Sequence, residues 1–227
     1  MSASDFREEA RGVLRGKWGK AALIVLCYIV VCILLEKVTG ILGEIIGSIV
    51  VAIVEVPLQF GFIISLFKLF KDENVEVFDF VSNSIKNFGK AWSITGWMIF
   101  KLLLPFMILV VSMFLLVGVF VSGNTALARI LIVIMVIDSI YFIMKSYYYQ
   151  LAFVVATDNP EMTGLEAVEK SENLMQGKRF NLFCLQLSFI GWIILGVIPF
   201  ALGLLWVVPY MQMSIFAFYK NTLNENA

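Results

Sequence analysis

Three ionisable residues interrupt long apolar stretches of the chain and are the side chains best placed for chemistry there. They are Glu55, Lys101 and Asp138. On insertion scales each costs about 2.5–3.5 kcal/mol inside a bilayer unless it is paired or hydrated, so all three are candidates for ion or proton coupling. Similar depths would allow a salt bridge between Lys101 and Asp138. The alternative is structural: Lys101 could extend to an interface, and Glu55, just before Pro57, could reach the outer headgroups or cap a kink.

A second group of polar residues in apolar stretches consists of three glutamines, each two positions before a small residue. The pairs are Gln59 with Gly61, Gln150 with Ala152, and Gln212 with Ser214. Counted at 1.5 Å per residue from the polar ends of their stretches, the glutamines lie about 12–18 Å into the bilayer. A buried amide needs partners, and such interhelical contacts contribute about 0.6–2 kcal/mol. We expect the three to form a polar centre between helices; the alternative is chance matching among apolar segments.

The composition excludes most familiar catalytic chemistry. The sequence has no histidine, which removes the usual general base and a common metal ligand. Cys27, Cys32 and Cys184 lie in apolar stretches without a CxxC pair, so we expect neither a zinc site nor a disulfide framework. Phosphate-loop, GxSxG and HExxH motifs are missing, and Asp138 lacks the second aspartate that an intramembrane protease needs. These absences predict a protein that is not an enzyme and needs no cofactor or metal.

Hydropathy indicates the elements that must position these residues. Of the 227 residues, 60% are hydrophobic and 15% are charged, with a mean hydropathy of +0.91; soluble domains average about 45–50% apolar and about 25% charged. Because a spanning helix needs about 20 apolar residues, we predict six, at roughly 18–36, 48–70, 95–119, 126–156, 180–198 and 202–219. Between the last two, Pro199, Gly203 and Pro209 predict a tight hairpin.

The distribution of basic residues predicts the orientation. Lys and Arg are frequent before the first stretch and in the second and fourth loops, whereas the first loop has only Lys37, the third only Arg129 and the fifth none. By the positive-inside rule both termini then lie in the cytosol. The equal totals of 17 basic and 17 acidic residues give no net field to attract nucleic acid.

Three segments on the predicted cytosolic side have sequence patterns typical of short amphipathic helices. Ser2 with Asp5 and Thr163 with Glu166 match the capping box that begins a helix, and Val75–Phe88 has apolar residues at helical spacing. We expect their apolar faces to pack in the membrane interface; docking of a partner is the alternative.

An internal repeat relates these helices to the membrane segments. A glycine, a lysine and an aromatic residue precede three of the stretches, as Gly16-Lys17-Trp18, Gly89-Lys90-Ala91-Trp92 and Gly177-Lys178-Arg179-Phe180. We therefore predict an all-α polytopic membrane helix bundle, a single domain over 1–227. Its six transmembrane helices would form three units, approximately 1–72, 73–159 and 160–227, each a cytosolic amphipathic helix plus a membrane hairpin.

Several motifs resemble one known family. They are Ala156-Thr157-Asp158-Asn159-Pro160, Leu174-Met175-Gln176-Gly177, Arg15-Gly16-Lys17-Trp18 and Pro57-Leu58-Gln59-Phe60-Gly61. This pattern resembles the bacterial DUF975 family of uncharacterised integral membrane proteins, over nearly the whole chain. The family is distantly similar to the membrane domain of some glycerophosphodiester phosphodiesterases, whose catalytic domain is a separate part not found here. The resemblance implies a bacterial plasma-membrane location and supplies no catalytic residue.

The expected function is a non-enzymatic membrane protein that binds or passes a lipophilic or amphipathic molecule, or assists a membrane complex. Its partners would be membrane lipid and a lipophilic or peptide ligand or a membrane protein. The alternative is a small transporter or channel subunit that couples ions through Glu55, Lys101 and Asp138.

Overall fold

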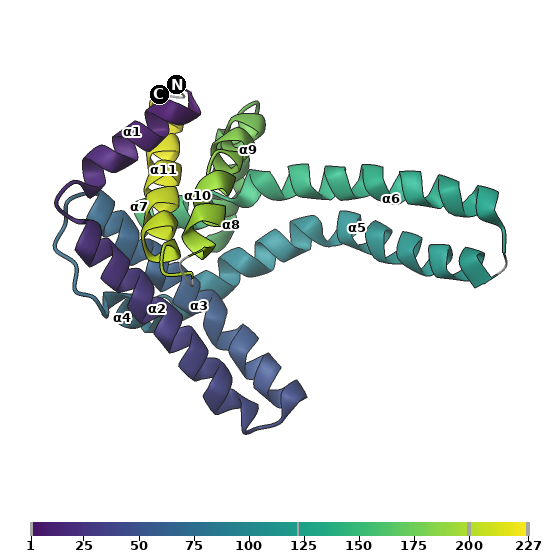
Figure 1. The fold of residues 1–227 in the computed structure, drawn as a ribbon, viewed down its shortest axis with the longest axis horizontal. Coiled ribbons are helices and arrows are strands. Elements are labelled where there is room, and N and C mark those ends of the chain that lie inside the picture. The colour runs from purple at the N-terminus through teal and green to yellow at the C-terminus, as the bar shows by residue number, and fades with distance from the viewer. Residues whose placement is uncertain (1, 122, 199–200, 226–227) are drawn as a thin grey trace.

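The computed structural model describes residues 2–121, 123–198 and 201–225, and this part of the chain is helical throughout apart from short connections (Figure 1). The elements are α1 (Ala3–Leu14), α2 (Trp18–Gly40), α3 (Glu44–Phe70), α4 (Asp79–Lys86), α5 (Phe88–Val121), α6 (Thr125–Ser146), the 3-10 turn η1 (Tyr147–Tyr149), α7 (Ala152–Asp158), α8 (Gly164–Leu174), α9 (Arg179–Leu187), α10 (Ile190–Val197) and α11 (Leu204–Glu225).

Five helical segments in the described residues are long and apolar enough to cross a membrane. They are α2, α3, α5, the Thr125–Asp158 segment and the Arg179–Val197 segment. The sixth predicted span, at 202–219, is not among them. It corresponds to α11, which contains Pro209 and Gln212 and is largely buried in the protein, for example at Met213, Phe216 and Ala217. A helix enclosed by its neighbours does not need the uniformly apolar surface of a helix that faces lipid.

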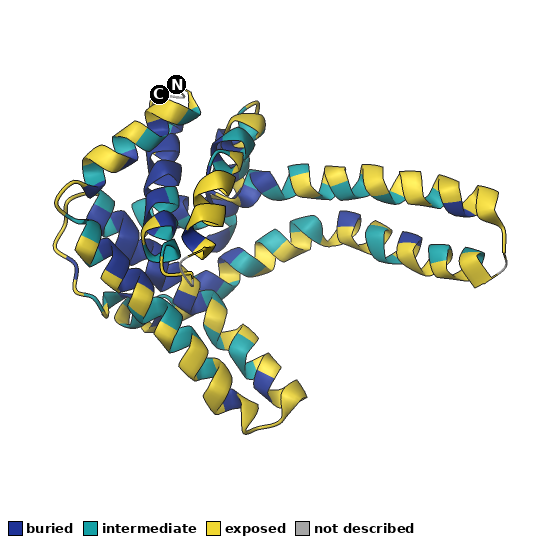
Figure 2. Ribbon diagram, viewed as in Figure 1, coloured by how far each residue is buried: buried dark blue, intermediate teal, exposed yellow. Residues whose placement is uncertain are grey.

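Two helical hairpins extend from a common body. Figure 1 shows α2–α3 and α5–α6 as separate arms, whereas α7, α8 and α11 lie in the body. Exposed residues dominate the outer parts of both arms (Figure 2), and many are large and apolar, including Leu34, Ile45, Leu104, Phe114 and Ile137. Apolar surface on this scale is what lipid-facing helices present.

Two of the short amphipathic helices begin as predicted, whereas the third, predicted over 75–88, is shorter and covers Asp79–Lys86. Apolar residues of α1 and α4 pack on the protein itself. Both capping boxes form, at Ser2 and Thr163. Phe6, on the buried face of α1, contacts the ring of Phe218 in α11 with centroids 5.3 Å apart. In α4 the buried Phe80 packs towards α3. The expectation of packing in the membrane interface was therefore wrong for these faces, because helices of the body cover them.

Glycines allow α4 and α8 to approach the long helices closely. A Cβ atom on Gly61 of α3 would collide with the backbone of Phe80 and Ser84 in α4, and one on Gly164 of α8 would collide with Ser93 in α5. Gly61 is the small residue two positions after Gln59. Gly61 forms the contact between α3 and the amphipathic helix that follows it.

The hairpin expected between the last two predicted membrane stretches is present. α10 ends at Val197 and α11 begins at Leu204. A Cβ atom on Gly203 would lie 2.5 Å from the Cα atom of Gly196, so the two helices nearly touch here. Pro199 lies outside the described residues, and Pro209 falls inside α11.

The stretch 126–156, predicted as one helix, is interrupted by η1. The chain turns at Tyr147–Tyr149 before α7 begins, and Tyr149 is buried there. The backbone carbonyl of Tyr148 accepts a hydrogen bond of 2.7 Å from the hydroxyl of Ser171 in α8. η1 thus separates α6 from α7, and the end of α7 joins the site described next.

Candidate functional site

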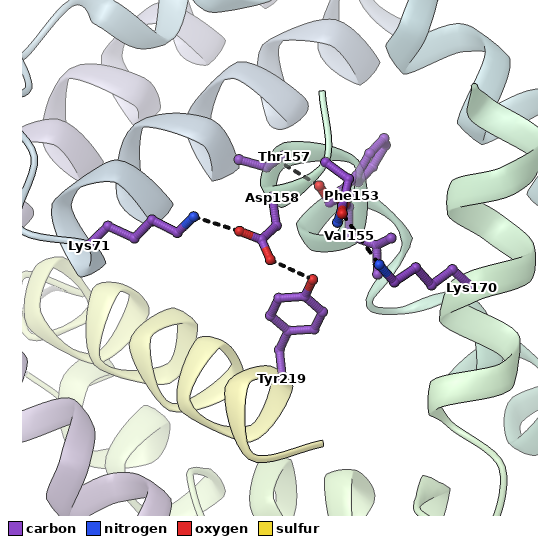
Figure 3. Close-up of polar contacts among 8 residues, drawn as sticks. Lys71, Phe153, Val155, Thr157, Asp158, Lys170 and Tyr219 are labelled. Carbon is purple, nitrogen blue, oxygen red and sulfur yellow. Dashed lines mark hydrogen bonds and ion pairs between the residues drawn. The ribbon is translucent and has the colours of Figure 1, made fainter. Parts of the chain in front are cut away.

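A polar cluster joins separate helices where α3, α7 and α11 meet (Figure 3). The Nζ atom of Lys71, which follows α3, lies 2.5 Å from Oδ1 of Asp158 at the end of α7. The hydroxyl of Tyr219 in α11 donates to Oδ2 of the same carboxylate at 2.9 Å. Asp158 is only partly exposed and Tyr219 is 1% exposed. One carboxylate therefore connects three helices that are remote in sequence.

The lysines of the three Gly-Lys motifs lie at the carboxyl ends of the same three helices. Each Nζ atom donates to a backbone carbonyl in or after the last turns: Lys17 to Leu69 at 3.4 Å, Lys90 to Ala156 at 3.2 Å and to Pro160 at 2.7 Å, and Lys178 to Thr222 at 3.5 Å. Carbonyls at a helix end lack intrahelical partners and carry partial negative charge, so a cation stabilises them. The repeated motif thus has a structural role as a cap on helix ends, which its spacing in the sequence does not reveal.

Lys17 also forms an ion pair with Asp72, at 2.6 Å. Its hydrogen bond and its positive charge lower the pKa of the Asp72 carboxyl. A depressed carboxyl pKa means that the pair contributes to stability at neutral pH and that this contribution is lost as the pH falls through the folded-state pKa.

We expect Lys90→Met to loosen the end of α7. The substitution keeps the length of the side chain but removes the ammonium that satisfies carbonyls of the 156–160 segment. The expected cost is about 1–2 kcal/mol, with faster amide hydrogen exchange in α7. Lys86→Met is the matched control, since Lys86 is exposed on α4. Equal exchange in the two variants would show that the cap contributes nothing.

Two cavities flank the Lys71–Asp158 pair. One of about 360 Å³ lies towards α11 and is lined by both members of the pair, Tyr219 and Lys220. The other, of about 270 Å³, lies between α3, α4, the start of α5 and the end of α7. Its lining combines aromatic and aliphatic side chains with Lys68, Lys71 and Lys90. We call this second space the α3–α4 cavity.

The predicted pair between Lys101 and Asp138 does not form. Lys101 pairs instead with Glu172 of α8, with Nζ 2.6 Å from Oε2. The reason is the start of α5 at Phe88 and the packing of α8 along its first part, which places Lys101 beside a polar helix. Glu55 lies elsewhere, exposed on α3 in a groove of about 410 Å³ that Glu36 and Glu44 also line. The three predicted charges therefore occupy three separate places.

Asp138 is the least satisfied of these charges. Its Oδ2 atom is buried and has no hydrogen-bond partner among the described residues. Asp138 is on α6, which packs on α5, and between Leu102 and Val121 the sequence of α5 has no ionisable side chain. A buried polar atom without a partner is costly.

Asp138→Leu should accordingly raise the free energy of unfolding, by about 1–3 kcal/mol. The leucine removes the unpaired oxygen and adds apolar surface in an apolar hairpin, whereas Asp138→Asn retains a polar group and should gain little. Thermal unfolding of the detergent-purified variants measures the difference. A loss of stability in the leucine variant would contradict this account and indicate a required polar partner.

The three glutamines predicted to form a polar centre differ in their exposure and in their partners. Gln59 and Gln150 are exposed and Gln212 is half-buried. Gln150 accepts a hydrogen bond of 2.7 Å from Gln186, whose carbonyl in turn accepts from the hydroxyl of Tyr147 at 2.7 Å. Within the described residues, no hydrogen bond joins one of the three predicted glutamines to another.

Helical geometry bears on the positions of Gln59 and Gln212. Residues two apart on an α-helix lie about 200° apart around its axis. Gly61 and Ser214 are buried on α3 and α11, so Gln59 and Gln212, two positions earlier on the same helices, tend to the opposite side. Gln150 precedes the start of α7, so this argument does not apply to it. The residues that do connect these helices, Lys71, Asp158 and Tyr219, stand at their polar ends. Lys71 and Asp158 carry opposite charges at the polar ends of two predicted membrane stretches. That pattern was the signal in the sequence that could have identified the cluster.

The apolar helices, the lipid-type surface of the arms and the polar cluster at the helix ends define a multi-pass α-helical membrane protein. The chain belongs to the family described as "Protein of unknown function (DUF975)", whose model matches residues 1–226. No curated protein and no solved structure matches the chain. The more distant similarity to the phosphodiesterase membrane domain stays a prediction.

Proposed function

We propose that this protein is a non-enzymatic component of the bacterial plasma membrane that binds an amphipathic molecule beside the Lys71–Asp158–Tyr219 cluster. It would cross the membrane with six helices, α11 included, and keep both termini in the cytosol. Basic residues in alternate loops support this orientation.

The main support for this proposal is the position of the two cavities. Both adjoin the Lys71–Asp158 pair, and both are lined by polar and aromatic side chains together; Phe67 lines each of them. They lie at the polar ends of long helices whose other parts expose apolar surface. A molecule with a polar head and an apolar body would find a suitable surface for each part.

The lysine caps support three repeated units. In each proposed unit, 1–72, 73–159 and 160–227, the Gly-Lys lysine contacts a carbonyl near the end of the last helix of the same unit. Such equivalence is expected if one amphipathic helix and one membrane hairpin form the basic element.

Ion-coupled transport has less support. Glu55, Lys101 and Asp138 lie apart, and Lys101 is paired with Glu172. A coupling pathway would require polar groups that connect these positions. A membrane-protein or peptide partner, in contrast, would be compatible with the exposed apolar arms.

Native mass spectrometry of the detergent-purified protein tests the proposal. We expect the wild type to retain an amphipathic molecule and the double variant Lys71→Met/Tyr219→Phe to lose it. Lys86→Met is the control, because Lys86 lines neither flanking cavity. If the double variant retains the molecule as well as the wild type does, the ligand binds at another place. If the wild type retains only detergent, the protein does not bind such a ligand.

A further inference from the structure

The α3–α4 cavity has an unbalanced positive charge. Three lysines line it, of which Lys71 is neutralised by Asp158. Lys90 donates to backbone carbonyls, which are neutral acceptors. Lys68 is half-buried and has no acceptor or ion-pair partner among the described residues. The acidic residue in the lining is Glu73, which is exposed.

A partly buried ammonium without a counter-charge is a favourable position for an anion. Hydrogen bonds between an ammonium and an anionic oxygen are roughly twice as strong as neutral ones. The Glu161 carboxylate also acts on the charge of Lys90, so Lys68 is the lysine of this lining that lacks a partner among the described residues. Phosphate-type oxyanions, with several acceptor oxygens, match two lysines on adjacent walls.

The rest of the lining distinguishes a lipid headgroup from a free ion. Phe60, Ile64 and Phe67 form an apolar wall of the cavity, which a small hydrophilic ion would not use. At about 270 Å³ the space is below the range of about 300–1,000 Å³ typical of whole drug-sized ligands. It therefore suits a headgroup whose acyl chains remain outside, along the apolar faces of the arms.

We propose that the α3–α4 cavity binds the phosphate headgroup of an anionic membrane lipid, with Lys68 as its principal ligand. The inference deepens the proposed function and rests on it, since it names the chemical class of the amphipathic molecule. Basic pockets between membrane helices on the cytosolic side are known to recognise such headgroups.

Lipid titration of the delipidated full-length protein tests this inference. The probes are phosphatidylglycerol, phosphatidylcholine and inorganic phosphate, each added to protein in neutral detergent and followed by thermal unfolding and native mass spectrometry. We expect phosphatidylglycerol to bind and raise the melting temperature, and phosphatidylcholine to have little effect. Lys68→Met should weaken phosphatidylglycerol binding by about tenfold or more. Lys86→Met should bind like the wild type.

The possible results separate the two proposals. Inorganic phosphate could stabilise the protein as strongly as phosphatidylglycerol does and lose this effect in Lys68→Met. That result would confirm an anion site but assign it to free phosphate instead of a lipid. Undiminished binding by a folded Lys68→Met, or equal binding of phosphatidylcholine, would overturn the inference. If an amphipathic molecule were then still lost from Lys71→Met/Tyr219→Phe, the proposed function would stand without it. Absence of any bound amphipath from wild type would overturn both.

Discussion

Gly61→Val should separate α4 from α3 and lower the melting temperature by roughly 5–10 °C. Any side chain at this position meets the backbone of Phe80 and Ser84, and backbone cannot move aside as a flexible side chain can. Overpacking of this kind costs about 1–3 kcal/mol or more, and 1 kcal/mol corresponds to about 2–4 °C for a chain of this size. Differential scanning fluorimetry of the purified protein measures the change.

Gly118→Val provides the matched control for this prediction. Gly118 lies in the membrane-facing part of α5, and a Cβ atom there would have nothing within 4 Å. The same chemical change should therefore leave the melting temperature near that of the wild type. If both variants melt alike, the close contact between α3 and α4 does not contribute to stability.

Asp158→Ala should have the second large effect, a loss of about 1–3 kcal/mol. The substitution leaves the buried hydroxyl of Tyr219 without its acceptor, which accounts for most of that cost. The ion pair with Lys71 is 44% exposed on the lysine side and so contributes less, about 0–1 kcal/mol. Chemical or thermal unfolding in detergent would measure both contributions.

A double-mutant cycle isolates the tyrosine contribution. Asp158→Ala/Tyr219→Phe removes the hydroxyl together with its acceptor, so it should lose less stability than the sum of the two single variants. Glu9→Ala is a suitable control, since it breaks the more exposed pair with Lys220, at 3.2 Å, and should cost little. Additive losses in the cycle would mean that the hydroxyl and carboxylate do not interact.

Features set by neighbouring residues could be predicted from the sequence. The capping boxes at Ser2 and Thr163 depend on a side chain three positions away, and both form. The long apolar helices follow from composition over about 20 residues, and five of the six meet the criteria for a span. The capping boxes depend on residues close in sequence, and the long helices depend on the average composition of one segment.

Features that depend on packing between segments could not be predicted. Periodicity gave the apolar face of α1 but not what covers it, because lipid and the side of α11 are equally suitable apolar surroundings. Lys101 and Glu172 are 71 positions apart, and their pairing requires the position of α8 on α5. For Gln59 and Gln212 the helical period matters as well, since a residue two positions from a buried small residue tends to the other side of an α-helix.

The lysine caps also have a consequence for the order in which the molecule is made. The cap contacts join residues 52, 66 and 44 positions apart, for Lys17, Lys90 and Lys178 in turn. Each can form as soon as its own part of the chain has left the ribosome, without waiting for later segments. A nascent chain arrested after the contact between Lys17 and Leu69 has formed should already resist protease in residues 17–69. The contact of Tyr219 with Asp158, like the third cap at Thr222, can form only when synthesis is nearly complete.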